Sequence, residues 1–192
     1  MTAQCTACLP FVASSAALLA GFTGLLLVAA VKDVRTMTIP NGISLAMAAL
    51  YPLHVAVSGA DWIGGVMAGG SVLAIGMLLF SLRLLGGGDV KLLAATSLWA
   101  GTALVLPALF VTATAGGLLC LVIWVRSGGP LRILRRLSGD AGRWSGRNPS
   151  LIVSGPAESA AVVPYAVAIL AGGAFVAAVQ MLPVLRLAET TL

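Results

Sequence analysis

The chain has 192 residues, of which 59% are hydrophobic and only 9% charged, and its mean hydropathy is +1.06. Ordinary soluble domains carry about 25% charged residues, so this composition excludes a soluble globular fold. The net charge of +5 does not indicate a nucleic-acid partner, because the basic residues are scattered between apolar runs. The composition therefore predicts an all-α polytopic membrane protein, with residues 1–192 forming a single transmembrane domain.

Five stretches of the chain lack Asp, Glu, Lys and Arg: residues 1–31, 36–60, 62–82, 92–125 and 159–185. A transmembrane helix needs about 20 apolar residues, so four of these stretches each predict one span. The stretch at 92–125 is compatible with one overlong helix or with two short ones that break near Gly101 and Pro107.

The distribution of basic residues decides between these alternatives. With two spans, ten of the eleven Lys and Arg residues lie on one side of the membrane and only Arg186 on the other, as the positive-inside rule requires. We therefore expect about six transmembrane helices, near residues 9–31, 41–59, 62–82, 90–105, 107–125 and 161–183. They would cross the membrane with both termini outside the cytoplasm.

Residues 126–158 form the one long polar segment and are predicted to be a basic cytoplasmic loop. Leucine and isoleucine alternate with arginine there at near-helical spacing. Two interpretations remain open: a short amphipathic helix that lies on anionic membrane lipid, or a solvated loop that enforces topology.

A carboxylate in or beside a membrane span is energetically costly, so each acidic residue raises a functional question. Four of the six acids are expected to be solvated charges in loops or in the tail: Asp61, Asp140, Glu158 and Glu189. Asp33 and Asp89 differ, because each lies at the cytoplasmic end of a predicted span. These two are the candidate functional acids.

The local sequences around the two acids are also unusual. Asp33 is followed by Ile39-Pro40-Asn41, where we expect a short turn after the first span and a new helix that starts at Pro40. Asp89 follows Gly86-Gly87-Gly88, three residues that permit backbone conformations closed to others and let another chain approach closely.

Two carboxylates on different spans supply what peptide hydrolysis needs without a metal or a cofactor. At hydrogen-bonding distance both cannot ionise, so one can deprotonate water while the other protonates the carbonyl oxygen. The alternative for each acid alone is an ion pair with a neighbouring base: Lys32 or Arg35 for Asp33, and Lys91 for Asp89. We expect both acids on the same face of the membrane, which favours the catalytic interpretation.

Three ordered blocks resemble the type IV prepilin peptidases, a family of intramembrane aspartyl proteases. The segment Gly86-Gly87-Gly88-Asp89 fits the GxGD signature, and its continuation Val90-Lys91-Leu92-Leu93 is similar to that of bacterial members. Asp33 with Ile39-Pro40-Asn41 is similar to the first aspartate motif. The third block, Pro164-Tyr165-Ala166-Val167-Ala168-Ile169, resembles that of short members that process Flp-type pilins in tight-adherence systems.

This resemblance implies cleavage of the leader from prepilins or pseudopilins at the cytoplasmic face of the bacterial inner membrane, with Asp33 and Asp89 as catalytic acids. It assigns Gly86, Gly87, Gly88 and Lys91 to the active-site loop, and Ile39, Pro40, Asn41, Pro164 and Tyr165 to the supporting motifs. Longer members carry an insertion with paired CxxC motifs for zinc, associated with N-methylation. This chain passes directly from its first span to Asp33, and Cys5 and Cys8 form one CxxC pair only. We therefore expect neither a metal site nor methyltransferase activity.

Two rival functions use the same residues differently. A small proton- or cation-coupled transporter would favour acids in mid-span and repeated halves, neither of which the sequence indicates. A non-catalytic subunit of a pilus or secretion assembly has no need of both acids.

The remaining conspicuous residues predict structural roles. His54, the sole histidine, is expected to be structural. Tryptophans at predicted span ends are typical of interfacial anchors: Trp62, Trp99 and Trp124. Paired glycines favour close packing between helices: Gly64-Gly65 and Gly69-Gly70.

Overall fold

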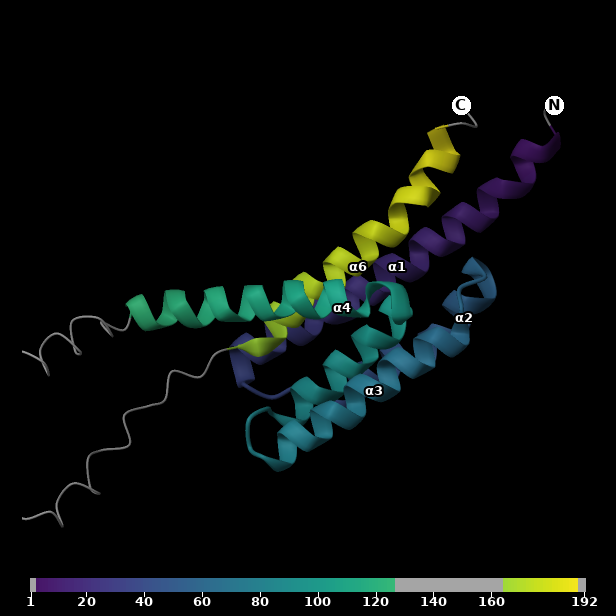
Figure 1. The fold of residues 1–192 in the computed structure, drawn as a ribbon. Helices are drawn as coiled ribbons and strands as arrows, with labels where there is room; N and C mark the ends of the chain where they lie inside the picture. The colour runs from purple at the N-terminus through teal and green to yellow at the C-terminus, as the bar shows by residue number, and fades with distance from the viewer. Residues whose placement is uncertain (1–2, 127–163, 190–192) are drawn as a thin grey trace, which may run out of the picture. The chain divides into compact units, whose positions relative to one another are not determined.

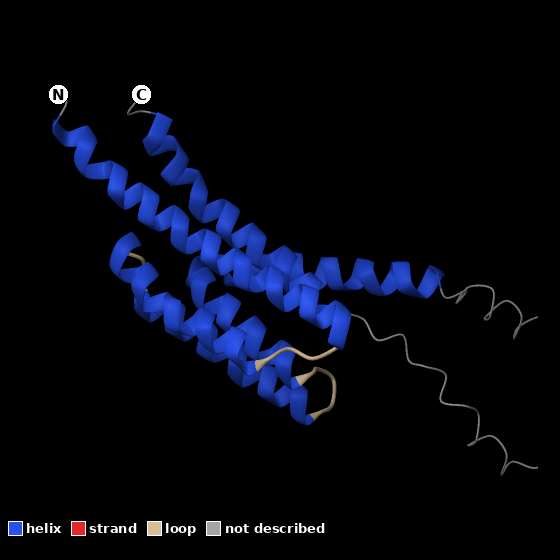
Figure 2. Cartoon of the chain, turned by 180° about the vertical axis from the view of Figure 1, so that it is seen from behind, coloured by secondary structure: helices blue, strands red, loops and turns tan. Residues whose placement is uncertain are grey.

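The computed structural model describes residues 3–126 and 164–189, with side chains at 13–126 and 164–183 (Figure 1). The regular elements are five helices: α1 (Ala3–Thr36), α2 (Asn41–Ser58), α3 (Trp62–Ser81), α4 (Gly87–Arg126) and α6 (Tyr165–Glu189). All five are long and apolar enough to cross a membrane, and the described ranges contain no strand (Figure 2). The prediction of an all-α polytopic membrane protein is confirmed. Beyond Arg126, the predicted basic loop lies outside the described residues.

The first helix ends later than expected. It continues past residue 31 to Thr36, so Asp33 belongs to its last turn. Met37 then adopts a left-handed conformation with φ of 51°, and its N–H donates to the carbonyl oxygen of Asp33 at 2.9 Å, which closes the helix end. Pro40 caps the next helix rather than starting it, with φ of −64° and ψ of 133°, and α2 begins at Asn41.

The fourth helix is broken at Gly101. This residue has φ of 63° and ψ of −178°, so α4 consists of two helical segments. An added Cβ at Gly101 would meet no atom within 4 Å, which means that the backbone conformation, and not crowding, requires glycine here. Of the two predicted breakers, Gly101 interrupts the helix, and Pro107 lies inside the second segment.

The connection between α2 and α3 depends on two local caps. Gly59 ends α2 in a left-handed conformation, with φ of 66°, and its N–H donates to Val55 O at 2.9 Å. Asp61 then caps α3, because its Oδ1 accepts the N–H of Ile63 at 3.1 Å. The Asp61 carboxylate is exposed, as expected, but it also has this capping role.

The core is organised around Trp99, in the first segment of α4. Its ring stacks on Phe22 of α1, with centroids 4.6 Å apart, and on His54 of α2 at 4.7 Å. The indole Nε1 donates to Met47 O at 2.9 Å. From α6, Gln180 Nε2 donates to Trp99 O at 2.7 Å. One residue therefore joins four helices.

This arrangement corrects one prediction and agrees with two others. Trp99 is 2% exposed, so it is a core residue and not an interfacial anchor. Trp62 and Trp124 are exposed, as anchors would be, and the buried His54 packs as a structural residue. Trp99 differs from these two tryptophans because neighbouring helices cover the face of α4 on which it lies. The position of a residue near a span end does not reveal whether its helix face is covered.

The helices around the core approach closely where glycine occurs. In Figures 1 and 2, α6 runs beside α1, and α2 and α3 run beside the first segment of α4. An added Cβ at Gly65 would lie 2.8 Å from Leu98 O of α4, and one at Gly69 would lie 3.1 Å from Leu98 Cβ. These glycines let α3 pack against α4.

Replacement of Trp99 by alanine should therefore lower the free energy of unfolding by about 3–5 kcal/mol, because it removes a buried ring and leaves a cavity. Thermal unfolding in detergent measures the change. Trp62→Ala is the matched control, since this ring is exposed, and it should change stability by less than about 0.5 kcal/mol. Equal losses for both variants would contradict the assignment of Trp99 to the core.

Candidate active site

Asp33 links the end of α1 to the start of α6. The residue is 8% exposed, and its Oδ2 accepts the backbone N–H of Ala166 at 3.0 Å. Ala166 lies in the first turn of α6, where backbone N–H groups have no partner within the helix. The Asp33 carboxylate therefore caps α6 from another helix, at an end that carries partial positive charge.

The segment around Pro164 explains why α6 begins where Asp33 can reach it. Pro164 O accepts the N–H of Val167 at 3.2 Å, which forms the first turn. The ring of Tyr165 packs on α4, since an added Cβ at Gly116 would lie 2.9 Å from Tyr165 Cε2. The predicted third block therefore fixes the helix end that binds Asp33.

Asp89 lies in the first turn of α4. This turn begins at Gly86, whose carbonyl oxygen accepts the N–H of Val90 at 3.1 Å. The half-buried carboxylate folds back over Gly86, because an added Cβ there would lie 2.8 Å from Asp89 Oδ2. The first turn of a helix favours a negative charge, so the local structure suits this acid.

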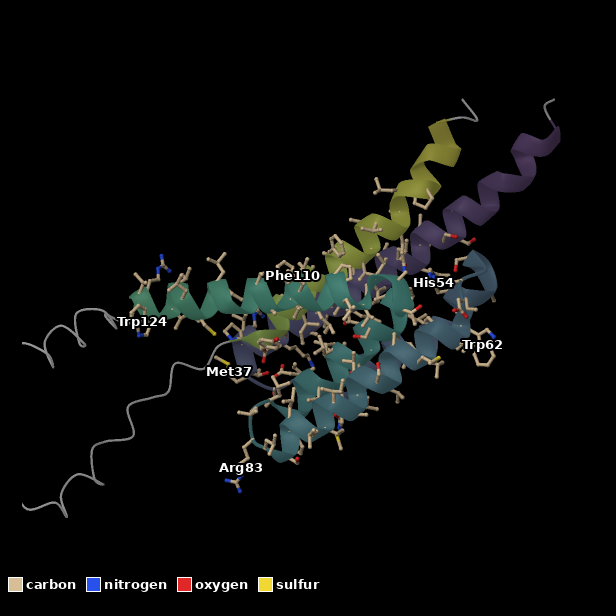
Figure 3. All side chains as sticks on the ribbon, in the orientation of Figure 1. Met37, His54, Trp62, Arg83, Phe110 and Trp124 are labelled. Carbon is tan, nitrogen blue, oxygen red and sulfur yellow. The ribbon has the colours of Figure 1, made fainter. Side chains whose placement is uncertain are left out.

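The two candidate acids lie at helix ends, Asp33 in the last turn of α1 and Asp89 in the first turn of α4. In Figure 3, Met37, just after α1, and Arg83, just after α3, lie toward one end of the helices, with His54 and Trp62 toward the other. The fold therefore places two carboxyl groups that are far apart in the sequence at a common end of the bundle.

Two roles were expected for the three glycines before Asp89: special backbone conformations and close approach of another segment. The structure supports only the second. Positive φ angles in the described ranges occur at Met37, Gly59, Arg83 and Gly101 and at no residue of the triplet. The triplet instead permits close contacts: an added Cβ would lie 3.3 Å from Phe80 Cε2 at Gly87 and 3.2 Å from Ile39 Cβ at Gly88. The expectation of special backbone conformations is wrong, and close approach is what requires glycine.

The contact between Gly88 and Ile39 joins the two aspartate motifs. A second link is the hydrogen bond from Lys91 Nζ to Asn41 Oδ1, at 3.1 Å. Both residues are exposed. The start of α2 and the first turns of α4 are therefore held together beside the acids.

Ion pairs with neighbouring bases do not account for the two acids. Within the described part of the chain, no ion pair joins Asp33 or Asp89 to the bases considered above: Lys32, Arg35 and Lys91. Nor do three or more His, Cys, Asp or Glu side chains gather there at a spacing suitable for a metal ion. The side chains of Cys5 and Cys8 lie outside the described residues.

Sequence reasoning singled out both acids as candidates and missed the Ala166 N–H. A backbone donor has no side-chain signature. The available signal was Pro164, which marks a helix start two residues earlier. What Pro164 does not reveal is which acid that helix end meets.

Comparison with models of protein families matched residues 20–121 to the type IV leader peptidase family. This match includes both candidate acids and more than half of the chain. Comparisons with curated proteins and with solved structures gave no significant match.

The capping role of Asp33 predicts different stabilities for two substitutions. Asp33→Ala removes the acceptor of the Ala166 N–H and should lower the free energy of unfolding by about 1 kcal/mol. Asp33→Asn keeps a side-chain oxygen and should lose less. Thermal unfolding in detergent, with hydrogen exchange at the Ala166 amide, measures both effects. Equal protection of that amide in the alanine variant and the wild type would contradict the cap.

Proposed function

The chain belongs to the type IV leader peptidase family, and on that basis we propose that it cleaves prepilin leader peptides by an aspartyl mechanism. Asp33 and Asp89 are the proposed catalytic acids. The observation that supports this assignment best is that both acids lie at helix ends whose motifs are in contact through Gly88 and Ile39, with Asp33 held by the Ala166 N–H. Family membership makes the protein a leader-peptidase-like hydrolase, and the two acids supply its proposed chemistry.

The proposed mechanism follows from one proton shared between two carboxyl groups. Because like charges repel, the pair holds one proton in the working state. Asp33 Oδ2 already accepts a hydrogen bond, so the proton resides on Asp33 Oδ1 or on Asp89. The ionised carboxylate takes a proton from water, which attacks the peptide carbonyl carbon, while the other acid protonates the carbonyl oxygen. The C–N bond then breaks, and the amine leaves with a proton.

The positions of the acids favour hydrolysis over ion transport. Asp33 lies in the last turn of α1 and Asp89 in the first turn of α4. A transport path would favour acids at the middle of spans, whereas a peptidase that acts at the membrane surface needs them at helix ends.

We further propose that the active site faces the cytoplasm from the inner membrane and that both termini lie outside. The ten-to-one distribution of Lys and Arg supports this orientation. It requires residues 90–125 to form two spans, and the break at Gly101 provides a point at which the chain can turn back.

The proposed substrates are Flp-type prepilins, cut without subsequent methylation. The third sequence block supports the Flp type. The absence of methylation follows from the connection between α1 and α2, which consists of residues 37–40 alone. Four residues are too few to fold a pocket for a methyl donor.

Neutral amides should abolish cleavage. Asp33→Asn and Asp89→Asn each remove a group that exchanges a proton, so each should reduce prepilin cleavage in membrane vesicles by about 10²–10⁴-fold or more. Asp61→Asn is the matched control: asparagine also caps helices well, so this variant should cleave normally. Substantial cleavage by either active-site variant would exclude the aspartyl mechanism.

Mass spectrometry tests the proposed lack of methylation. Mature pilin produced with this protein as the sole peptidase should carry an unmodified N-terminus. A uniform gain of one methyl group, absent when the protein is omitted from the reaction, would show that the chain transfers methyl groups.

A further inference from the structure

Gly173, on α6, is buried at a point where three helices meet. An added Cβ there would clash with Leu26 Cδ1 of α1 and would lie 3.4 Å from Thr96 Cγ2 of α4. Both neighbouring helices therefore pack directly against the backbone of α6 at this residue. They are the helix that carries Asp33 and the helix that carries Asp89.

The spacing along the chain relates this contact to the candidate active site. In each of the three helices, the residue at the contact lies seven positions from a residue of the site: Leu26 from Asp33, Thr96 from Asp89 and Gly173 from Ala166. Seven residues are about two helical turns, or about 10 Å. The contact at Gly173 is therefore one level of the bundle, and the two acids with the Ala166 N–H form a second level two turns away.

Residues seven positions apart also lie on nearly the same face of a helix, because seven residues fall only about 20° short of two full turns. Asp33 therefore lies on the face of α1 that contacts α6, in agreement with its hydrogen bond to the Ala166 N–H. By the same reasoning, Asp89 lies on the face of α4 that contacts α6. The closeness of the helices at Gly173 thus affects the positions of both acids.

The neighbours of Gly173 have little room to move aside. Leu26 is fully buried, so its side chain has no open space into which it can turn. Thr96 is also buried, and its hydroxyl donates to Leu92 O at 2.9 Å, which leaves its methyl group against α6. An added methyl group at Gly173 would therefore push helices apart, as overpacking of a filled core does.

We propose that Gly173 is a positioning residue for Asp33 and Asp89, because it lets the two helices that carry them pack closely against α6. The inference rests on the proposed peptidase function and adds to it a residue that touches neither acid. With glycine at this position, α1 stays near enough to α6 for Asp33 to bind the Ala166 N–H. A larger residue widens the spacing between the helices and displaces both carboxyl groups.

Gly173→Ala tests the proposal because it adds one methyl group at a point without space for it. The matched control is Gly24→Ala on α1, since Gly24 is an exposed helical glycine whose added Cβ meets no atom within 4 Å. Cleavage of a prepilin is measured in phosphatidylethanolamine–phosphatidylglycerol vesicles. Gly173→Ala should lower kcat by about 10–100-fold and change KM by less than about twofold, because a displacement of about 1 Å impairs the reaction more than binding. Gly24→Ala should keep the kcat of the wild type.

A second substitution distinguishes positioning from general damage to the fold. Leu26→Val removes the δ-carbon that the added methyl group would meet. The double variant Gly173→Ala/Leu26→Val should therefore cleave several-fold faster than Gly173→Ala alone. Thermal unfolding in detergent establishes that each variant is folded, so that kcat is compared per folded protein. A loss of kcat that Leu26→Val leaves unchanged would overturn the proposal.

Hydrogen exchange at the Ala166 amide tests the positioning of Asp33 without any cleavage. This amide should exchange faster in Gly173→Ala than in the wild type, because Asp33 moves away from it, and at the wild-type rate in Gly24→Ala. Equal kcat in the two glycine variants, or equal exchange at Ala166, would show that Gly173 has no positioning role. If the wild type does not cleave prepilin, the proposed function fails, whereas the exchange measurement still decides whether Gly173 holds Asp33 in place.

Discussion

The hydrogen bond between Asp33 and the Ala166 N–H connects residues 133 positions apart in the chain. The first N–H groups of a helix have no partner within it, and where they are buried a group from elsewhere in the protein must accept their hydrogen bonds. Asp33 meets part of this requirement for α6. The position of the acid and the position of the last described helix therefore depend on each other, and a displacement of either would disturb both.

Close contacts at small residues bring the second acid to the same place. The glycines before Asp89 let the first turn of α4 approach Ile39 and Phe80, and Gly86 leaves room for the carboxylate itself. The core around Trp99 then holds the helices in this arrangement. Packing within the bundle thus determines the relative position of the two candidate acids.

The surface beside the acids shows where the packing of the chain is incomplete. Gly65 and Gly69 are explained by contacts within the protein, whereas Gly70 and the Ser44 hydroxyl are not. Both line one groove between α2, α3 and the first segment of α4.

The sequence alone determined the helical membrane fold, a break within residues 92–125 and the two candidate acids, because long apolar runs and rare charges leave few alternatives, whereas the structure placed that break at Gly101 and not at Pro107. It also indicated the junctions at Pro40 and Pro164. The tertiary structure decided that Trp99 is buried, that the glycine triplet serves close approach, and that Asp33 binds the Ala166 N–H. These features depend on which helix faces pack against one another. Every residue except proline carries a backbone N–H, so the sequence does not show which N–H will bind Asp33.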